Sequence, residues 1–180
     1  GIYMKDFSVR SMCLCALFAA LIAAGAFLRI PLPLIPFTLQ TMFIMLAGLL
    51  LGKKYAAASC AVYVILGLVG LPIFTQGGGI GYVLKPTFGY LIGFIPGAYI
   101  IGAMAEKKTS FTKMYLACLA GLAVIYLLGT VYYYLLATLY LKKAVVISAM
   151  LISCVFTTLP GDLLLAVFAV FLSKRLKRHI

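Results

Sequence analysis

The stretch TFGYLIGFIPGAYIIGAM, residues 87–104, carries no charged side chain. A helix needs about 20 mostly apolar residues to cross the hydrocarbon core of a bilayer, so this stretch predicts a membrane-spanning helix. The rest of the chain has the same character, because 66% of its 180 residues are hydrophobic and 10% are charged. Soluble domains carry about 25% charged residues. The sequence therefore predicts an integral membrane protein.

Apolar runs of similar character fill most of the chain. The predicted spans lie near residues 11–28, 37–52, 55–71, 87–104, 114–140 and 145–173. Their unequal lengths indicate tilted or kinked helices, or helix ends that extend beyond the lipid. We therefore expect an all-α membrane protein of six transmembrane helices, built as a single transmembrane domain over residues 1–180 with tails at 1–10 and 174–180.

Basic residues are unequally distributed between alternate loops. Eleven lie on one side of the predicted membrane: Lys5, Arg10, Lys53, Lys54, Lys107, Lys108, Lys113, Lys174, Arg175, Lys177 and Arg178. Four lie on the other side: Arg29, Lys85, Lys142 and Lys143. Because cytoplasmic loops are rich in Lys and Arg, the first side and both termini are predicted to be cytoplasmic. The net charge of +12 is thus spread over loops, and no nucleic-acid partner is predicted.

Two of the outer loops are rich in residues that prevent helix formation. They are RIPLPLIPF at residues 29–37 and LPIFTQGGGIGYVLKP at residues 71–86. Prolines among apolar residues and a run of glycines indicate loops that fold down onto the helices as a lid. Tight surface turns are the alternative.

Asp162 is the one acid of three that lies inside an apolar run. A charged side chain at that depth costs at least about 2.5 kcal/mol, so an intramembrane acid is a candidate for ligand recognition. The step Pro160–Gly161 before it would open the helix and free backbone groups to a cavity. The alternative role is a structural hydrogen bond or ion pair between two helices.

Lys85 and Tyr126 are further candidates. Lys85 lies immediately before the span at 87–104, on the side that carries few charges. We expect Lys85 either to contact a ligand or to serve only as an anchor at the membrane interface. Tyr126 belongs to a tyrosine-rich span, where some phenols form an interfacial belt and others line a pocket.

Catalytic and nucleotide-binding motifs are absent from the sequence. There is no HExxH motif, no nucleophile elbow and no pair of intramembrane carboxylates, so an enzyme is not predicted. A P-loop is also missing, so the chain cannot power transport with ATP by itself. The five cysteines include no CxxC pair, and no metal or cofactor is predicted.

Small residues recur at four-residue spacing in two spans, which allows helices to approach closely. Gly89, Gly93 and Gly97 are expected to pack inside the protein. The face made by Ala16, Ala20 and Ala24 would pack in the same way or dock a partner helix.

Several motifs occur in an order that is typical of one family. They are Pro36-Phe37-Thr38-Leu39-Gln40-Thr41, Leu46-Ala47-Gly48 with Leu51-Gly52, Gly70-Leu71-Pro72, Pro86-Thr87 with Gly89-Tyr90, and Pro160-Gly161-Asp162. Together they resemble the BioY family over residues 11–173. Members of this family are the biotin-specific substrate-binding (S) components of energy-coupling-factor (ECF) transporters.

The resemblance implies a six-helix S-component fold in the cell membrane of a prokaryote. It implies that biotin binds near the outer face, under the first and third interhelical loops. The early alanine face would dock a transmembrane coupling subunit that works with two cytoplasmic ATPases. Beside Asp162, Lys85 and Tyr126, the expected substrate-binding positions are Thr38, Gln40, Gln76, Gly78, Gly79, Thr87 and Tyr90.

Two positions depart from the family pattern. The family reads PGDxxK in the last span and Gly-Pro-Thr before the fourth, whereas this chain has Leu165 at the lysine position and Lys85 at the glycine position. In one interpretation, Lys85 replaces the missing lysine as the positive charge that binds the carboxylate of biotin. In the other, the substrate is another vitamin-like carboxylate such as lipoate or dethiobiotin. An ionised Asp162 would then accept hydrogen bonds from ligand N–H groups. The alternative of a different class is a non-transport membrane scaffold subunit.

Overall fold

The computed structural model describes residues 8–30, 37–107 and 110–177. Its helices are α1 Val9–Phe27, α2 Gln40–Leu51, α3 Lys53–Val69, α4 Phe88–Met104, α5 Phe111–Leu135, α6 Ile147–Leu151 and α7 Leu159–Leu176. A short 3-10 helix, η1 Ile80–Leu84, lies between α3 and α4. There are also two π-helical turns. η2 Leu136–Tyr140 extends α5, and η3 Ile152–Phe156 lies between α6 and α7.

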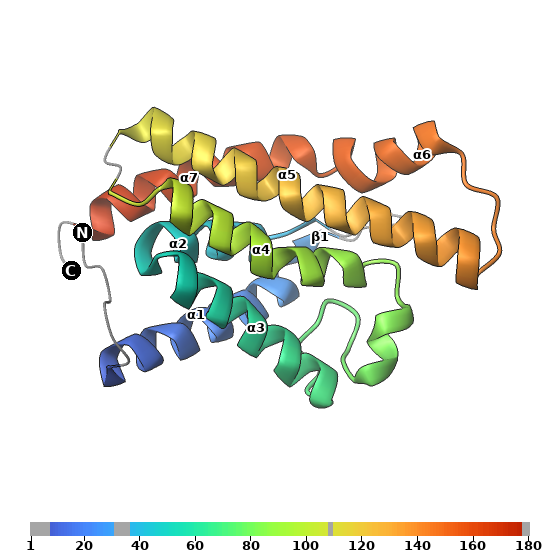
Figure 1. The fold of residues 1–180 in the computed structure, drawn as a ribbon, viewed down its shortest axis with the longest axis horizontal. Coiled ribbons are helices and arrows are strands. Elements are labelled where there is room, and N and C mark those ends of the chain that lie inside the picture. The colour runs from blue at the N-terminus through green and yellow to red at the C-terminus, as the bar shows by residue number, and fades with distance from the viewer. Residues whose placement is uncertain (1–7, 31–36, 108–109, 178–180) are drawn as a thin grey trace.

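The helices lie side by side along the long axis of the molecule (Figure 1). α6, η3 and α7 form one pass over Ile147–Leu176, so the described chain makes six passes. The first turn of α1 and the last turn of α7 lie at the same end of the bundle, on the left of Figure 1. The bundle closes mainly through α4, which packs against α5, α3 and α2.

Three passes have the length and apolar composition of a full membrane span among the described residues: Val9–Phe27, Phe111–Tyr140 and Ile147–Leu176. The unequal lengths of the six predicted spans are thus confirmed. α2 has 12 residues, which at about 1.5 Å per residue is far shorter than the roughly 30 Å of a hydrocarbon core. It cannot cross the core by itself and relies on the elements at its ends.

The predicted span at 37–52 is shorter because its first residues are extended. Phe37–Thr38 form strand β2, which pairs antiparallel with strand β1 at Arg29–Ile30. The sequence before β2 is rich in proline, which cannot continue a hydrogen-bonded helix. α2 ends at Gly52, whose φ of +85° suits glycine and turns the chain directly into α3.

The span predicted at 145–173 forms one pass, Ile147–Leu176, and the opening expected at Pro160–Gly161 lies just before that step. The pass is interrupted at Thr157–Thr158, between η3 and α7. Pro160 lies in the first turn of α7, where its missing N–H leaves no helical hydrogen bond unmade. The break places Asp162 in the first turn of a new helix, away from the middle of a regular one.

The glycine face of α4 packs inside the protein, which confirms the prediction for Gly89, Gly93 and Gly97. A Cβ atom at Gly93 would lie 3.0 Å from the Cα of Ile125 on α5. At Gly97 it would lie 2.7 Å from Cγ1 of the same isoleucine. The missing side chains therefore let the α4 and α5 backbones approach closely.

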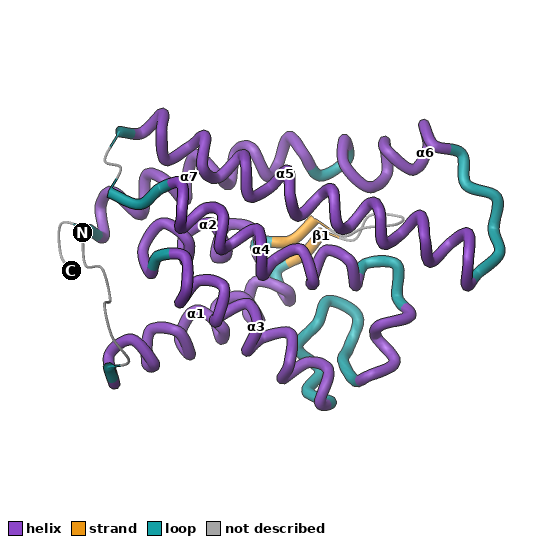
Figure 2. The backbone as a smooth tube through the Cα atoms, viewed as in Figure 1, coloured by secondary structure: helices purple, strands orange, loops and turns teal. Residues whose placement is uncertain are grey.

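The loop between α3 and α4 folds onto the bundle, as expected of a lid (Figure 2). Phe74 is 1% exposed, and its ring occupies the space beside Gly67 of α3 that a Cβ would need. The backbone N–H of Gly79 donates to the carbonyl of Gly67 at 2.7 Å. The other predicted lid, at residues 29–37, has residues 31–36 outside the described part of the chain.

Candidate functional site: a cavity around Asp162

A cavity with an empty volume of about 550 Å³, part of it open to solvent, lies among α2, α4, α5, α7 and the loop before α4. Its lining consists of Phe37, Thr38, Gln40, Thr41, Thr75, Tyr82, Thr87, Tyr90, Leu91, Phe94, Ile125, Tyr126, Thr158 and Asp162. None of these described lining residues is basic.

Asp162 is the charged group of the cavity and is 3% exposed. One carboxylate oxygen accepts a hydrogen bond of 2.8 Å from the Thr41 hydroxyl, and the other accepts from the Tyr126 hydroxyl. The N-terminal end of α7, where Asp162 lies, favours a negative charge. The carboxylate is thus held by hydroxyl donors and a helix end.

We call the residues around this carboxylate the inner wall: Thr41, Tyr90, Tyr126, Thr158 and Asp162. The Tyr90 hydroxyl donates to the Cys154 carbonyl at 2.6 Å, and the Thr158 hydroxyl donates to Tyr126 at 3.4 Å. Each hydroxyl has one proton, so the protons of all four inner-wall hydroxyls are already used within the protein. What the inner wall offers a ligand is therefore mainly lone pairs, which match N–H or O–H donors.

The opposite side of the cavity is bounded by the folded loop and the start of α4. The Tyr82 hydroxyl lies 3.1 Å from that of Thr75 and 3.3 Å from that of Thr87, and all three residues are buried. These hydroxyls tie the loop to the helix that follows it. The cavity consequently lies toward the end of the bundle that carries this loop.

Comparison with known proteins identifies the chain. A model of the BioY family matches residues 3–180. This chain belongs to the BioY family. The resemblance seen in the sequence motifs is thereby confirmed.

Similar proteins carry the same family name. A probable biotin transporter BioY from Lysinibacillus sphaericus is 45% identical over 175 residues, which cover 96% of this chain and 89% of that protein. The biotin transporter BioY of Thermotoga maritima is 48% identical over 122 residues, covering 67% of this chain and 72% of that protein.

A crystal structure shares the architecture. It is the S-component for biotin from an ECF-type ABC transporter, and the two chains superpose with a TM-score of 0.83 at 28% identity. The match covers 94% of this chain and 92% of that one. The BioY chain therefore has the S-component fold of a multi-pass membrane protein.

The structure brings six of the ten expected substrate-binding residues of this BioY chain together in the cavity lining. They are Asp162, Gln40, Thr38, Thr87, Tyr90 and Tyr126. The other four, Lys85, Gln76, Gly78 and Gly79, lie outside the lining. Lys85 and Gln76 are exposed.

The two glycines outside the lining, Gly78 and Gly79, allow the loop backbone to adopt its conformation. Gly79 has a φ of +95°, which suits glycine. A Cβ at Gly78 would overlap the carbonyl oxygen of Leu71 and lie 2.9 Å from its carbon. Leu165, at the family's lysine position, is 8% exposed and does not line the cavity.

Sequence reasoning missed several lining residues: Phe37, Thr41, Thr75, Tyr82, Leu91, Phe94, Ile125 and Thr158. Three of them carried a signal. Thr158 precedes Asp162 by four residues, which is one helical turn. Phe37 and Thr41 belong with Gln40 to the FTLQT motif. Thr75 and Tyr82 had none, because only the fold of the loop brings them to the cavity.

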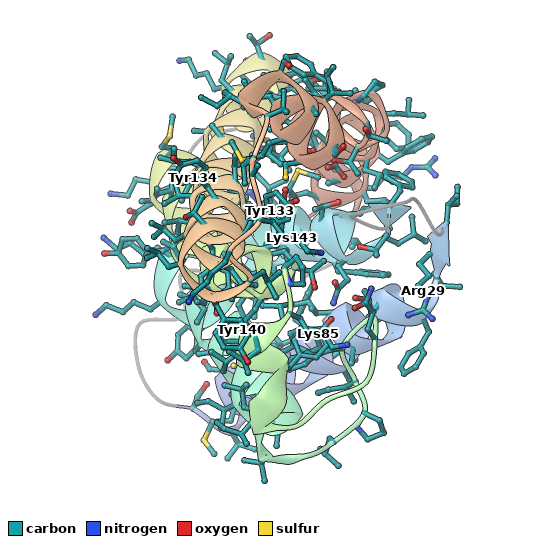
Figure 3. All side chains as sticks on the ribbon, turned by 90° about the vertical axis from the view of Figure 1, so that its right-hand side faces the viewer. Arg29, Lys85, Tyr133, Tyr134, Tyr140 and Lys143 are labelled. Carbon is teal, nitrogen blue, oxygen red and sulfur yellow. The ribbon has the colours of Figure 1, made fainter. Side chains whose placement is uncertain are left out.

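Basic residues of this BioY chain lie beyond the cavity, at the end of the bundle opposite to the described chain ends. Figure 3 looks onto that end and shows Lys143 near the middle, Lys85 below it and Arg29 at the edge. All three are exposed.

Proposed function

We propose that this chain is the biotin-binding S component of an ECF-type vitamin uptake transporter in the cell membrane of a prokaryote. It acts without a cofactor and without catalysing a reaction, as a single transmembrane substrate-binding domain. The observation that carries the proposal is the acceptor-rich inner wall around Asp162, inside a fold shared with an S component for biotin. The ureido ring of biotin presents the N–H donors that such a wall requires.

The same observation separates biotin from the other candidate ligands. The dithiolane ring of lipoate has no N–H group, so it would leave the Asp162 carboxylate without a ligand donor. Dethiobiotin keeps the ureido ring and should bind, with less apolar contact because it lacks the sulfur ring. A non-transport scaffold subunit would bind none of them.

Calorimetric titration of the purified chain with biotin, dethiobiotin and lipoate tests the proposal. We expect saturable binding of biotin, weaker binding of dethiobiotin and no binding of lipoate. Absence of biotin binding to folded protein would refute the proposed function. Tighter binding of lipoate than of biotin would identify lipoate as the substrate instead.

We place both termini in the cytoplasm, because eleven basic residues lie on their side against four on the other. The shared position of the first turn of α1 and the last turn of α7 supports this placement. A cysteine in either tail that reacts with an impermeant thiol reagent from outside intact cells would contradict it.

Replacement of Ala20 by Trp is expected to impair docking to the ECF coupling subunit, which with two ATPases would energise uptake. Ala16, Ala20 and Ala24 are exposed along one face of α1, and a small-residue face allows a partner helix to approach. An indole at its centre would separate the helices. Copurification with the coupling subunit should fall while biotin binding by the isolated chain persists.

Leu127→Trp is the matched control for Ala20→Trp. Leu127 is 62% exposed on α5, away from the alanine face. It should leave copurification unchanged. Equal copurification of the two variants would remove the alanine face as the docking surface.

Lys85→Ala is expected to weaken the binding of biotin more than that of biotin amide. Lys85 is exposed, and exposed ion pairs contribute about 0.2–1 kcal/mol, so the loss for the acid should be about 1.4-fold to fivefold. The neutral amide should lose nothing. If both ligands weaken equally, Lys85 is an interfacial anchor, and the same pair of titrations on Arg29→Ala is the next step.

A further inference from the structure

Gln40 contributes a side chain of defined polarity to the cavity. It is 2% exposed and lines the cavity. Its Nε2 donates to the Ile22 carbonyl at 3.1 Å and to the Tyr63 hydroxyl at 2.7 Å. A backbone carbonyl can only accept, so the nitrogen of the amide must face Ile22. Both Nε2 protons are then used, and Oε1 is the atom that Gln40 can offer to a ligand.

Tyr63 fixes the second of these bonds from outside the cavity. It is 0% exposed on α3 and is not among the lining residues. Its hydroxyl donates to the Ile73 carbonyl at 2.9 Å. Because that carbonyl also can only accept, the single phenolic proton is committed to it. Tyr63 is left with lone pairs for Gln40, which again requires the nitrogen of the amide at that position.

The acceptor at Ile73 is held in place by the folded loop. The rings of Phe74 and Tyr63 meet edge to face, with centroids 5.4 Å apart. Phe74 is in turn packed beside Gly67, and the loop returns to Gly67 through the bond from Gly79. Figure 2 shows this loop beside the end of α3. The direction of the hydrogen bonds is therefore set in the loop and transmitted through Tyr63 to the cavity.

We propose that Tyr63 is a positioning residue for ligand specificity, which holds the Gln40 amide with Oε1 toward the cavity so that it requires an N–H donor from the ligand. This inference rests on the proposed function. It adds a second required acceptor to the one at Asp162. A ligand with two separate N–H groups, such as a ureido ring, satisfies both, whereas a ligand with one donor leaves a buried acceptor unpaired.

Hydrogen exchange of side-chain amides tests the bonding pattern without any ligand. The chain has two glutamines, Gln40 and Gln76, and no asparagine, so its side-chain amide NMR spectrum contains two NH₂ groups. We expect both Gln40 protons to exchange slowly and those of the exposed Gln76 to exchange rapidly. In Tyr63→Phe, one Gln40 proton should exchange at least about tenfold faster. Rapid exchange of both Gln40 protons in the unaltered protein would overturn the proposal.

Ligand discrimination tests the consequence. Two biotin analogues serve as probes, each with one ureido N–H replaced by oxygen as a cyclic carbamate. One of the two analogues lacks the N–H that would donate to Gln40. The unaltered protein should bind biotin at least about tenfold more tightly than this analogue. Tyr63→Phe keeps the ring but leaves the Ile22 carbonyl as the remaining acceptor for Nε2. The amide is then held less firmly, so this preference should fall by about tenfold. Gln40→Met should lower it similarly.

A double-mutant comparison separates positioning from a general structural role. If Tyr63 acts through Gln40, adding Tyr63→Phe to Gln40→Met should not lower the preference further. Tyr132→Phe is the matched control, because the Tyr132 hydroxyl also donates to a loop carbonyl, that of Val83, without contacting Gln40. It should keep the preference of the unaltered protein.

The results that would refute the role of Tyr63 differ from those that would refute the proposed function. A preference within about twofold of the unaltered protein in Tyr63→Phe, or an equal loss in the Gln40→Met background, would overturn the role of Tyr63. Absence of biotin binding by the unaltered protein would refute the proposed function instead. If Tyr63→Phe does not fold, the exchange rates of the unaltered protein still decide whether Gln40 has the proposed bonds.

Discussion

Asp162→Asn is expected to weaken biotin binding by about tenfold to more than a hundredfold, which corresponds to roughly 1.5–3 kcal/mol for a buried hydrogen bond to a charged group. Both carboxylate oxygens of Asp162 accept from protein hydroxyls, those of Thr41 and Tyr126. An amide nitrogen in place of one oxygen would meet a donor with a donor. It would also present an N–H where the ligand needs an acceptor. Calorimetric titration with biotin measures the loss.

Glu106→Gln is the matched control for this substitution. Glu106 lies beyond the C-terminal end of α4 and outside the cavity lining. The same loss of one carboxylate there should leave biotin affinity unchanged. The thermal midpoint of each unliganded variant shows whether the fold is intact. Unaltered affinity in folded Asp162→Asn would mean that the acid has only a structural role.

Gly102→Ala, at a buried position of α4, is expected to destabilise the bundle more than the same methyl group added at a glycine with open space around it. A Cβ at Gly102 would lie 2.5 Å from the Cα of Lys53 and 2.7 Å from the carbonyl carbon of Gly52. These are backbone atoms of the turn between α2 and α3, which cannot rotate away as a side chain can. Forcing α4 from this turn should lower the free energy of unfolding by about 1–3 kcal/mol.

Gly81→Ala tests whether the position or the methyl group matters. Gly81 lies in η1, and a Cβ there would have nothing within 4 Å. Its substitution should change the free energy of unfolding by less than about 0.5 kcal/mol. Thermal unfolding in one detergent compares the two variants. Equal midpoints for Gly102→Ala and Gly81→Ala would show that the α4 contact with the turn does not limit stability.

The class of the protein and one central residue of its site could be predicted from the sequence. An apolar run long enough to span a bilayer is a property of consecutive residues, so membrane insertion needs no knowledge of contacts. A lone acid within such a run is conspicuous because its insertion is costly, and this singled out Asp162. The glycine face of α4 was predictable for the same reason, since helical spacing alone places Gly89, Gly93 and Gly97 together.

Only the tertiary structure decided which polar groups meet. Thr41 and Asp162 are separated by 121 positions in the chain, and their hydrogen bond depends on the packing of α2 against α7. No periodicity relates residues on different helices. The direction of the Gln40 amide likewise depends on carbonyls from α1 and from the α3–α4 loop, which the sequence pattern leaves unrelated.

The break before α7 and the position of Lys85 show the same division. Hydropathy predicted one span over 145–173, and the Pro160–Gly161 step predicted an opening of its helix. The exact place of the interruption could not be predicted, because an apolar composition is compatible with regular and interrupted helices alike. The structure interrupts the pass at Thr157–Thr158 and so turns the first turn of α7 toward the cavity. Lys85 was expected at the site because it stands at the family's glycine position before Pro86 and Thr87. The backbone at the end of η1 instead leaves Lys85 exposed while Thr87 is buried. Composition and helical spacing thus determined the environment of the chain and its unusual charge, whereas the hydrogen-bond partners of that charge were determined by long-range packing.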